Sequence, residues 1–138
     1  MKTALVLLIF VFAGYLSLHA QSGAAMKASL ERGKALYEQY CLVCHQADGS
    51  GVQNLNPPLI KTKWVQGDKS ELIRIILKGL DTEIEVDGDI YNNVMPPVDY
   101  LSDQEIADVL TYVRNNFSNK ASAITAVEVK TLRAKLLK

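Results

Sequence analysis

The two cysteines of this chain stand three residues apart and directly before a histidine, in the segment CLVCH at residues 41–45. The other histidine, His19, falls in an N-terminal stretch that we expect to be removed. Thiols and imidazole nitrogens bind metals, and thiols also form disulfides or add to other groups. The chemistry of the mature chain therefore concentrates at Cys41, Cys44 and His45, where three kinds of chemistry compete.

Zinc binding and thiol–disulfide exchange both fit this cluster poorly. A structural zinc site takes four ligands, usually from two such pairs, and only carboxylates are left to complete the set. In thiol–disulfide exchange the first cysteine opens a helix, whose N-terminal dipole lowers the pKa of the thiol. Here Cys41 ends the helix predicted over residues 26–40, with no βαβ pattern around it. A structural disulfide is also disfavoured, because so small a loop contributes little stability.

Covalent attachment of haem is the third chemistry, and Cys-x-x-Cys-His is its signature. Two thiols one helical turn apart can each add to a vinyl group on one edge of the porphyrin, and the next histidine then lies under the iron. Both cysteines become thioethers, which explains how an exported protein carries them without a disulfide. The motif by itself is only moderately specific, so the rest of the chain must support it.

Helical periodicity precedes the cluster, and proline loops follow it. Apolar residues at spacings of three and four predict the helix over residues 26–40, and Gly33 within it predicts the close approach of another helix. Residues 54–59 (NLNPPL) cannot lie inside a helix. A capping box of Asp68 and Glu71 then opens a helix that ends near Gly79.

The second half of the chain predicts a loop or small hairpin and then two more helices. Residues 81–94 alternate weakly around the turn signal Asp87-Gly88, and the segment MPP at 95–97 stops any helix. The pairs Ser102 with Glu105 and Thr125 with Glu128 are capping boxes that open the two helices. The last segment is either a short surface helix or a frayed tail. The whole chain is predicted to be all-α with long loops.

Residues 1–24 have the layout of a secretory signal peptide: a basic start at Lys2, an uncharged apolar stretch and then small residues. The apolar stretch of sixteen residues falls short of the ~20 that a membrane-spanning helix needs. We expect cleavage after Ala20 or Ala24, with an uncleaved anchor as the alternative. The expected organisation is this leader, one domain over residues 25–118 and a C-terminal extension over residues 119–138.

The composition sets limits on size and partners. The chain has 138 residues, 15 basic and 15 acidic, and no internal repeat, which suits a single neutral domain. No basic stripe points to nucleic acid. The acidic run at residues 81–89 and the basic C-terminal segment could each face a partner or solvent, and contact with a membrane would be peripheral or through an uncleaved leader. We expect a monomer in the periplasm or otherwise exported.

Over residues 27–117 the chain resembles a monohaem class I cytochrome c. Four segments match in order: GKALYEQYCLVCH, NPPL, VMPP and IADVLTYVRNNF. They resemble the first helix with the haem motif, the proline loop, the loop of the methionine ligand and the C-terminal helix. The resemblance implies the all-α class I cytochrome c fold, with helices around one covalently bound haem c. It also explains Gly33, which would let the C-terminal helix cross at Val109, Leu110 and Tyr112.

The resemblance also implies the residues of the site. Cys41 and Cys44 would form the thioethers, and His45 and Met95 would be the axial ligands of the iron. Met26, near the start of the first helix, is the competing methionine.

Other residues would complete the haem pocket. The carbonyl of Pro57, or less favourably that of Pro58, would orient the histidine. Trp64 would either bind a haem propionate through its indole N–H or simply pack in the core. Tyr91 and Asn93 are candidates for similar contacts, although an ordinary loop role suits them better.

Iron with histidine and methionine ligands has no open position, so the implied function is one-electron transfer rather than catalysis. The chain would accept electrons from a dehydrogenase or membrane complex and pass them to an oxidase or reductase. Two alternatives stay open. The chain could be the haem subunit of a larger dehydrogenase or reductase complex, or a ligand-binding or peroxidatic haem protein if Met95 is not a stable ligand.

Overall fold

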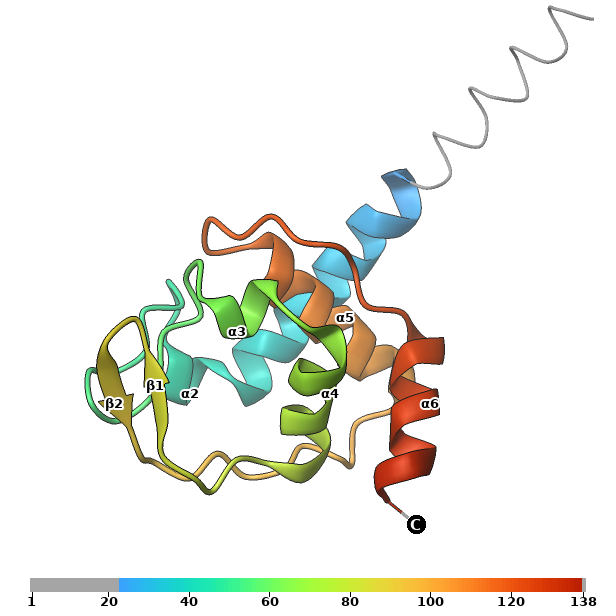
Figure 1. Cartoon of the computed structure of the whole chain (residues 1–138). Helices are drawn as coiled ribbons and strands as arrows, with labels where there is room; N and C mark the ends of the chain where they lie inside the picture. Colours follow the sequence, from blue (N-terminus) through green and yellow to red (C-terminus); the bar gives the residue numbers. More distant parts are fainter. Residues whose placement is uncertain (1–22, 138) are drawn as a thin grey trace, which may run out of the picture.

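The computed structural model of the chain describes residues 23–137, which fold mainly into helices (Figure 1). The leader and its cleavage site at Ala20 lie outside this range, and Ala24 falls at the start of the first helix. The elements in order are the first helix (23–40), α2 (Leu42–His45), α3 (Lys63–Gln66), α4 (Lys69–Lys78), β1 (Ile84–Val86), β2 (Asp89–Tyr91), α5 (Asp103–Asn115) and α6 (Ala126–Leu136). The predicted all-α architecture is confirmed, with one small hairpin added.

The first helix crosses α5 at Gly33. A Cβ atom on Gly33 would come 2.7 Å from Cβ of Tyr112 and closer still to the carbonyl oxygen of Asp108. The predicted close approach is therefore confirmed, and backbone as well as side chain forms the contact. Only glycine lets the two helices come this near.

The helix starts follow the capping signals with one exception. Ser102 and Thr125 form complete capping boxes with Glu105 and Glu128. The Asp68 side chain caps α4 by accepting hydrogen bonds from the backbone N–H groups of Ser70 and Glu71. The Glu71 side chain does not accept from the backbone N–H of Asp68, and it accepts from Arg74 instead. The predicted box at this helix is therefore wrong in its second half. The short helices α2 and α3 were not predicted as separate elements.

The C-terminal segment is a helix, and the alternative of a frayed tail is wrong. Helix α6 lies against α4 and α5 (Figure 1) and completely buries Val129 in the common core. Ion pairs join Lys69 to Glu128 at 2.9 Å and Arg133 to Asp103 at 2.7 Å. The extension is thus joined to the helical core by both apolar and charged contacts.

Strands β1 and β2 form a hairpin that turns at Asp87 and Gly88. Of the two predicted alternatives, a loop or a small hairpin, the hairpin is confirmed. Both turn residues have positive φ, at 53° and 93°, which is the type I′ geometry that suits a two-residue hairpin. Val86 and Tyr91 face inward and are buried. Within residues 23–137 no helix combines the length and apolarity needed to cross a membrane.

Candidate functional site

An apolar crevice opens between α2, the proline loop, α4, the hairpin and α5. The empty space between these walls is about 710 Å³, a figure that includes open solvent at the mouth. Its lining is Cys41, His45, Pro57, Pro58, Leu59, Thr62, Trp64, Val65, Leu72, Ile75, Ile76, Leu80, Ile84, Val86, Met95, Val109, Leu110 and Val113. A second hollow adjoins it and shares Cys41, His45 and Met95 with it. We call this second hollow the outer half of the crevice and the first the inner half.

His45 reaches the crevice with its ring already oriented. Its Nδ1 lies 3.0 Å from the carbonyl oxygen of Pro57, so Nδ1–H donates there and Nε2 is left as the ligating nitrogen. Burial lowers the pKa of His45, although the contact with Pro57 acts in the opposite direction. The imidazole is therefore favoured in the neutral form that binds metal ions.

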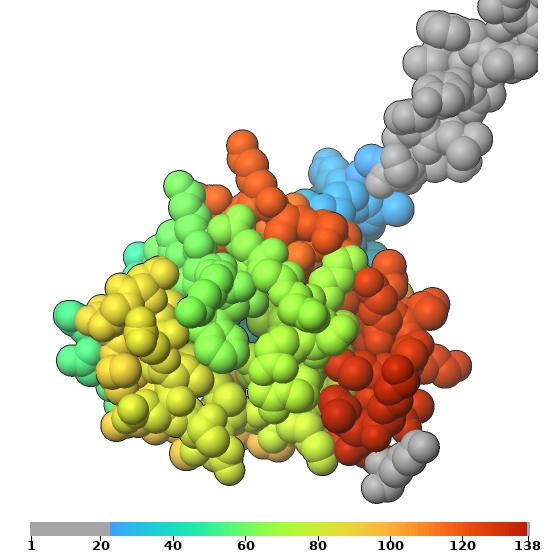
Figure 2. Space-filling model, viewed as in Figure 1, coloured from blue at the N-terminus to red at the C-terminus, as the bar shows by residue number. Residues whose placement is uncertain are grey.

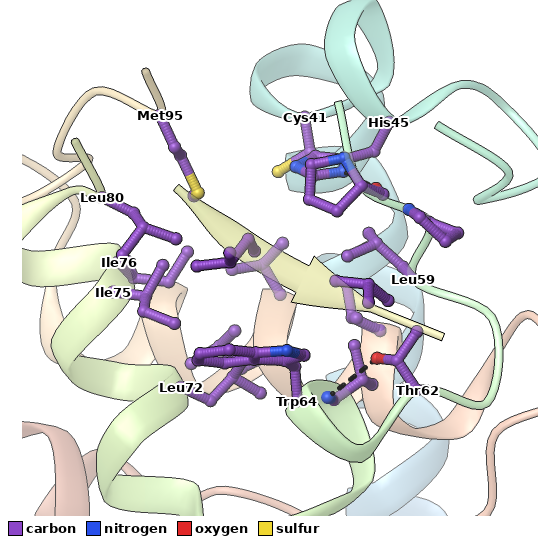
Figure 3. Close-up of a pocket in the computed structure, with 18 residues that line it drawn as sticks. Cys41, His45, Leu59, Thr62, Trp64, Leu72, Ile75, Ile76, Leu80 and Met95 are labelled. Atoms are coloured by element: carbon purple, nitrogen blue, oxygen red, sulfur yellow. Dashed lines mark hydrogen bonds between the residues drawn. The ribbon is translucent and has the colours of Figure 1, made fainter. Parts of the chain in front are cut away.

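Met95 enters the same crevice from the loop after the hairpin, and Figure 3 shows its sulfur directed into the space that the His45 ring also faces. Its backbone pairs with that of Leu80 through two hydrogen bonds, of 2.8 and 2.9 Å. Val98 N–H donates to the carbonyl of Ile76, three residues further along the loop. Gly79, at φ +73°, lets the Met95 carbonyl pass within 2.6 Å of where a Cβ would stand. The end of α4 thus fixes the position of this thioether.

The two thiols stand on the turn that leads to His45. Cys41 lines both halves of the crevice, whereas Cys44 is exposed at its outer half. Burial raises the pKa of Cys41 to about 11, with Cys44 adding to the effect. Both thiols are free, and they stand on the short helix α2, Cys41 at its N-cap and Cys44 directly before His45.

The other residues predicted for the haem pocket also lie at the crevice. Pro57 contacts His45 as expected, and Pro58 lines the inner half. Trp64 lines the inner half, and its indole N–H donates to the carbonyl of Glu85 on β1 at 3.2 Å. A propionate contact of Trp64 stays a prediction.

Tyr91 and Asn93 line the outer half of the crevice. The Asn93 side chain donates to that of Asn56 at 2.8 Å, which links the methionine loop to the proline loop.

Two buried polar residues behind the crevice had no signal in the sequence. Arg114 is 2% exposed and donates to the carbonyls of Val65, Gly67 and Ser122 at 2.7, 3.1 and 2.9 Å. The carbonyls of Val65 and Gly67 belong to one segment and that of Ser122 to another far along the chain, so local patterns cannot pair them with Arg114. Arg114 thereby joins α5 both to the crevice wall and to the C-terminal extension.

Asn119 is the second of these residues, and it is 4% exposed. Its amide donates to the carbonyls of Leu59 and Val113, each at 2.8 Å, and its oxygen accepts from Lys61 N–H at 2.7 Å. Leu59 lines the crevice. The start of the C-terminal extension thus holds the segment that forms one wall of the site.

Comparison with known proteins identifies the family. The family model Cytochrome c matches residues 30–117. A cytochrome c-552 of Thermus thermophilus is 39% identical over 114 residues, covering 76% of this chain and 86% of that protein. A fructose dehydrogenase cytochrome subunit of Gluconobacter japonicus is 36% identical over 110 residues, covering 74% of this chain and 22% of that subunit.

The residues present fit a covalently bound haem. The crevice is almost entirely apolar, two free thiols lie along it, and an oriented imidazole enters it from α2 and a thioether from the loop after the hairpin. Among residues 23–137, no group of three or more His, Cys, Asp or Glu side chains could hold a bare metal ion. The chain therefore belongs to the cytochrome c family, as a monohaem class I member that carries haem c and transfers electrons.

Proposed function

We propose that Cys41 and Cys44 bind the haem as thioethers and that His45 and Met95 are its axial ligands. The observation that carries the proposal is that His45, oriented by Pro57 at 3.0 Å, and Met95 line one apolar crevice. Each S–H would add across a vinyl double bond, with no atom lost. The haem would supply a one-electron Fe(II)/Fe(III) couple.

The chain's own residues would tune this couple toward the reduced state. A methionine sulfur favours Fe(II) relative to a second histidine, and the apolar lining disfavours the extra charge of Fe(III). Pairing of Met95 with Leu80 would keep the sulfur in place in both oxidation states. With both axial positions filled, the chain acts as an electron carrier and not as an enzyme.

The carrier would work outside the cytoplasm, in the periplasm or attached to the membrane surface. The support is the leader sequence of residues 1–24. Its partners would be a dehydrogenase or membrane complex as donor and an oxidase or reductase as acceptor. Relatives named as cytochrome subunits of dehydrogenases and of a cbb3-type oxidase support these classes of partner.

The proposal is tested on haem-loaded protein by the weak far-red absorption band of ferric iron bound to methionine sulfur. We expect the band in the native protein and in Met26→Ala, and its loss in Met95→Ala. Met26 is the matched control, because it is the other methionine among the described residues. Native protein without the band, or with tight binding of carbon monoxide to its reduced form, would leave a ligand-binding or peroxidatic haem protein as the better account.

A second candidate is a haem subunit of a larger dehydrogenase complex. It is favoured by relatives such as the fructose dehydrogenase subunit, in which the match covers 22% of a longer chain. The affinity-tagged chain expressed in its own host decides between the two functions. Recovery as a free monomer supports the mobile carrier, and recovery in a fixed stoichiometric complex supports the subunit.

A further inference from the structure

The segment that leads away from Met95 has few apolar contacts to hold it in place. Residues 96–101, here called the connecting segment, join Met95 to the N-cap residue of α5. Four of these six residues are exposed, and Leu101 is the buried one. Pro96 and Pro97 have no backbone N–H to donate. A segment with so little buried apolar surface opens at a low free-energy cost unless other contacts hold it.

The backbone of the connecting segment makes two hydrogen bonds to other backbone groups of residues 23–137, and both involve Val98. Its N–H donates to the carbonyl of Ile76 on α4 at 2.8 Å, and its carbonyl accepts from Leu101 N–H at 3.3 Å. The first bond ties the segment to α4, whereas the second is long and internal. The carbonyls of Asp99 and Leu101 are left for a different kind of donor.

Arg133 of α6 is that donor. Its Nη1 and Nη2 donate to the carbonyls of Asp99 and Leu101, each at 2.6 Å, and its Nε donates to the carboxylate of Asp103 at 2.7 Å. The guanidinium thus spans the end of the connecting segment and the first residue of α5. Charge-assisted hydrogen bonds are roughly twice as strong as neutral ones, and the planar fork of an arginine fixes their directions.

Helix α6 gives Arg133 a firm base. Figure 2 shows α6, in red, in direct contact with α4, in light green. Val129 of α6 is completely buried in the common core. Lys69, the first residue of α4, pairs with Glu128 of α6 at 2.9 Å. Through Arg133 the connecting segment is therefore tied to an element that is itself packed on the core.

We propose that Arg133 is a positioning residue for Met95. For the sulfur to leave the crevice, the backbone bridge from Met95 to Leu80 must open, and the chain beyond Met95 must move with it. The bonds from Arg133 oppose that movement. Arg133 thereby keeps the thioether in the crevice and denies its place to other ligands. This role rests on the ligation of iron by Met95 that is proposed above.

A general stabilising role of α6 is the competing explanation. The second ion pair of α6, between Lys69 and Glu128, is about as exposed as that of Arg133, but its partners lie on α4 and α6 and not on the connecting segment. If α6 only stabilised the fold, loss of either ion pair would loosen Met95 to a similar extent. The location of the acceptors of Arg133 instead predicts an effect that is specific to Arg133.

Imidazole binding to ferric, haem-loaded protein measures how readily Met95 leaves the iron. Imidazole replaces the methionine sulfur, and the far-red band disappears with it. At saturating imidazole the observed rate approaches the rate at which the sulfur leaves. This limiting rate should rise about tenfold in Arg133→Gln, which removes the charge and the fork. It should rise less in Arg133→Lys, which keeps the charge without the fork.

Two variants are matched controls for the loss of a positive charge. Lys69→Gln removes the other ion pair of α6, and Lys130→Gln removes an exposed charge from α6 itself. Both limiting rates should stay within about twofold of the native rate. A rate for Lys69→Gln that rises as much as the rate for Arg133→Gln would overturn the proposal, and so would native rates in both Arg133 variants.

Amide hydrogen exchange at Val98 follows the connecting segment without using the absorbance of the haem. The N–H of Val98 should exchange about tenfold faster in Arg133→Gln than in the native protein, and no faster in Lys69→Gln. Unchanged exchange at Val98 in Arg133→Gln would mean that Arg133 does not hold the segment, and would overturn the proposal.

The native protein separates this role of Arg133 from the ligation on which it rests. Native protein without the far-red band would contradict ligation by Met95 itself, and the role of Arg133 with it. A native band together with unchanged rates in the Arg133 variants would contradict the role of Arg133 alone and leave the ligation in place.

Discussion

At the scale of single residues, Asp108 shows how a buried charge joins two helices. It is 1% exposed and accepts hydrogen bonds from Ser29, Arg32 and Gln104 at 2.6 to 3.0 Å. Burial alone would raise its pKa, but the hydrogen bonds from Arg32, Ser29 and Gln104 together lower the pKa of Asp108 below its usual value. The side chain therefore remains a carboxylate in the folded protein.

This depressed pKa predicts a specific sensitivity to acid. The stabilisation from Asp108 is fully present above its unfolded pKa of about 3.9 and is lost as pH falls through the lower folded pKa. Asp108→Asn should reduce the free energy of unfolding at neutral pH by roughly 1–3 kcal/mol. It should also flatten the decline of stability between about pH 5 and pH 2. Urea unfolding across this range measures both effects.

Asp81→Asn, at an exposed position, is the control and should leave the acid decline of stability unchanged. The role given to Asp108 is contradicted if Asp108→Asn and native protein lose stability in parallel as pH falls.

Asn119 allows an isosteric test of the contacts behind the crevice. Asn119→Asp places an oxygen where the amide nitrogen donates to the carbonyls of Leu59 and Val113. The free energy of unfolding should fall by roughly 3 kcal/mol, because a buried carboxylate oxygen then faces two carbonyl oxygens with no hydrogen-bond donor between them. Asn116→Asp should change it by less than about 0.5 kcal/mol, as is usual for an exposed site. The oxygen of Asn116 that accepts from Phe117 N–H is retained in that variant.

Denaturant unfolding of the two haem-loaded variants makes the comparison. Similar losses for Asn119→Asp and Asn116→Asp would mean that the Asn119 contacts do not support the crevice wall.

At the scale of elements, α6 is the part whose role the structure changes most. The sequence left a surface helix and a frayed tail open, yet α6 packs on α4 and α5. Val129 and Val127 lie on the same helix, with exposures of 0% and 73%. This pair separates core packing from helix propensity, because both positions undergo the same substitution.

Val129→Ala should lower the free energy of unfolding by about 1–3 kcal/mol through lost burial and the cavity left behind. Val127→Ala should stay within about 0.5 kcal/mol of the native value. Urea midpoints at unchanged m-values measure the two differences. If neither variant moves the midpoint, α6 does not contribute to the common core.

At the scale of the whole molecule, the sequence predicts the helices but not what joins them. Capping pairs such as Ser102 with Glu105 are local, so they located the start of α5 correctly. Gly33 predicted a close helix crossing, because its cost in mid-helix needs compensation. Arg114 and Asn119 could not be predicted, since their partners are backbone carbonyls brought together only by the fold.

The candidate site likewise has parts that the local sequence predicts and parts that only the fold brings together. CLVCH and VMPP are short segments whose residue types indicate their chemistry, so the sequence alone points to Cys41, Cys44, His45 and Met95. The contact between His45 and Pro57 was expected from the resemblance and is present. The indole N–H of Trp64 instead donates to the backbone carbonyl of Glu85. This partner is available only because the segment that contains Glu85 folds as a hairpin. Side-chain geometry of this kind is a property of the whole molecule.

We propose that Met95 and His45 are the two axial ligands of one haem iron. The most direct measurement is the NMR spectrum of reduced, haem-loaded protein labelled with carbon-13 at its methionine methyl groups. A methyl group directly over the porphyrin feels its ring current, so we predict one signal shifted far upfield, present in Met26→Ala and lost in Met95→Ala. Native protein with every methionine methyl signal in its ordinary range would contradict the account.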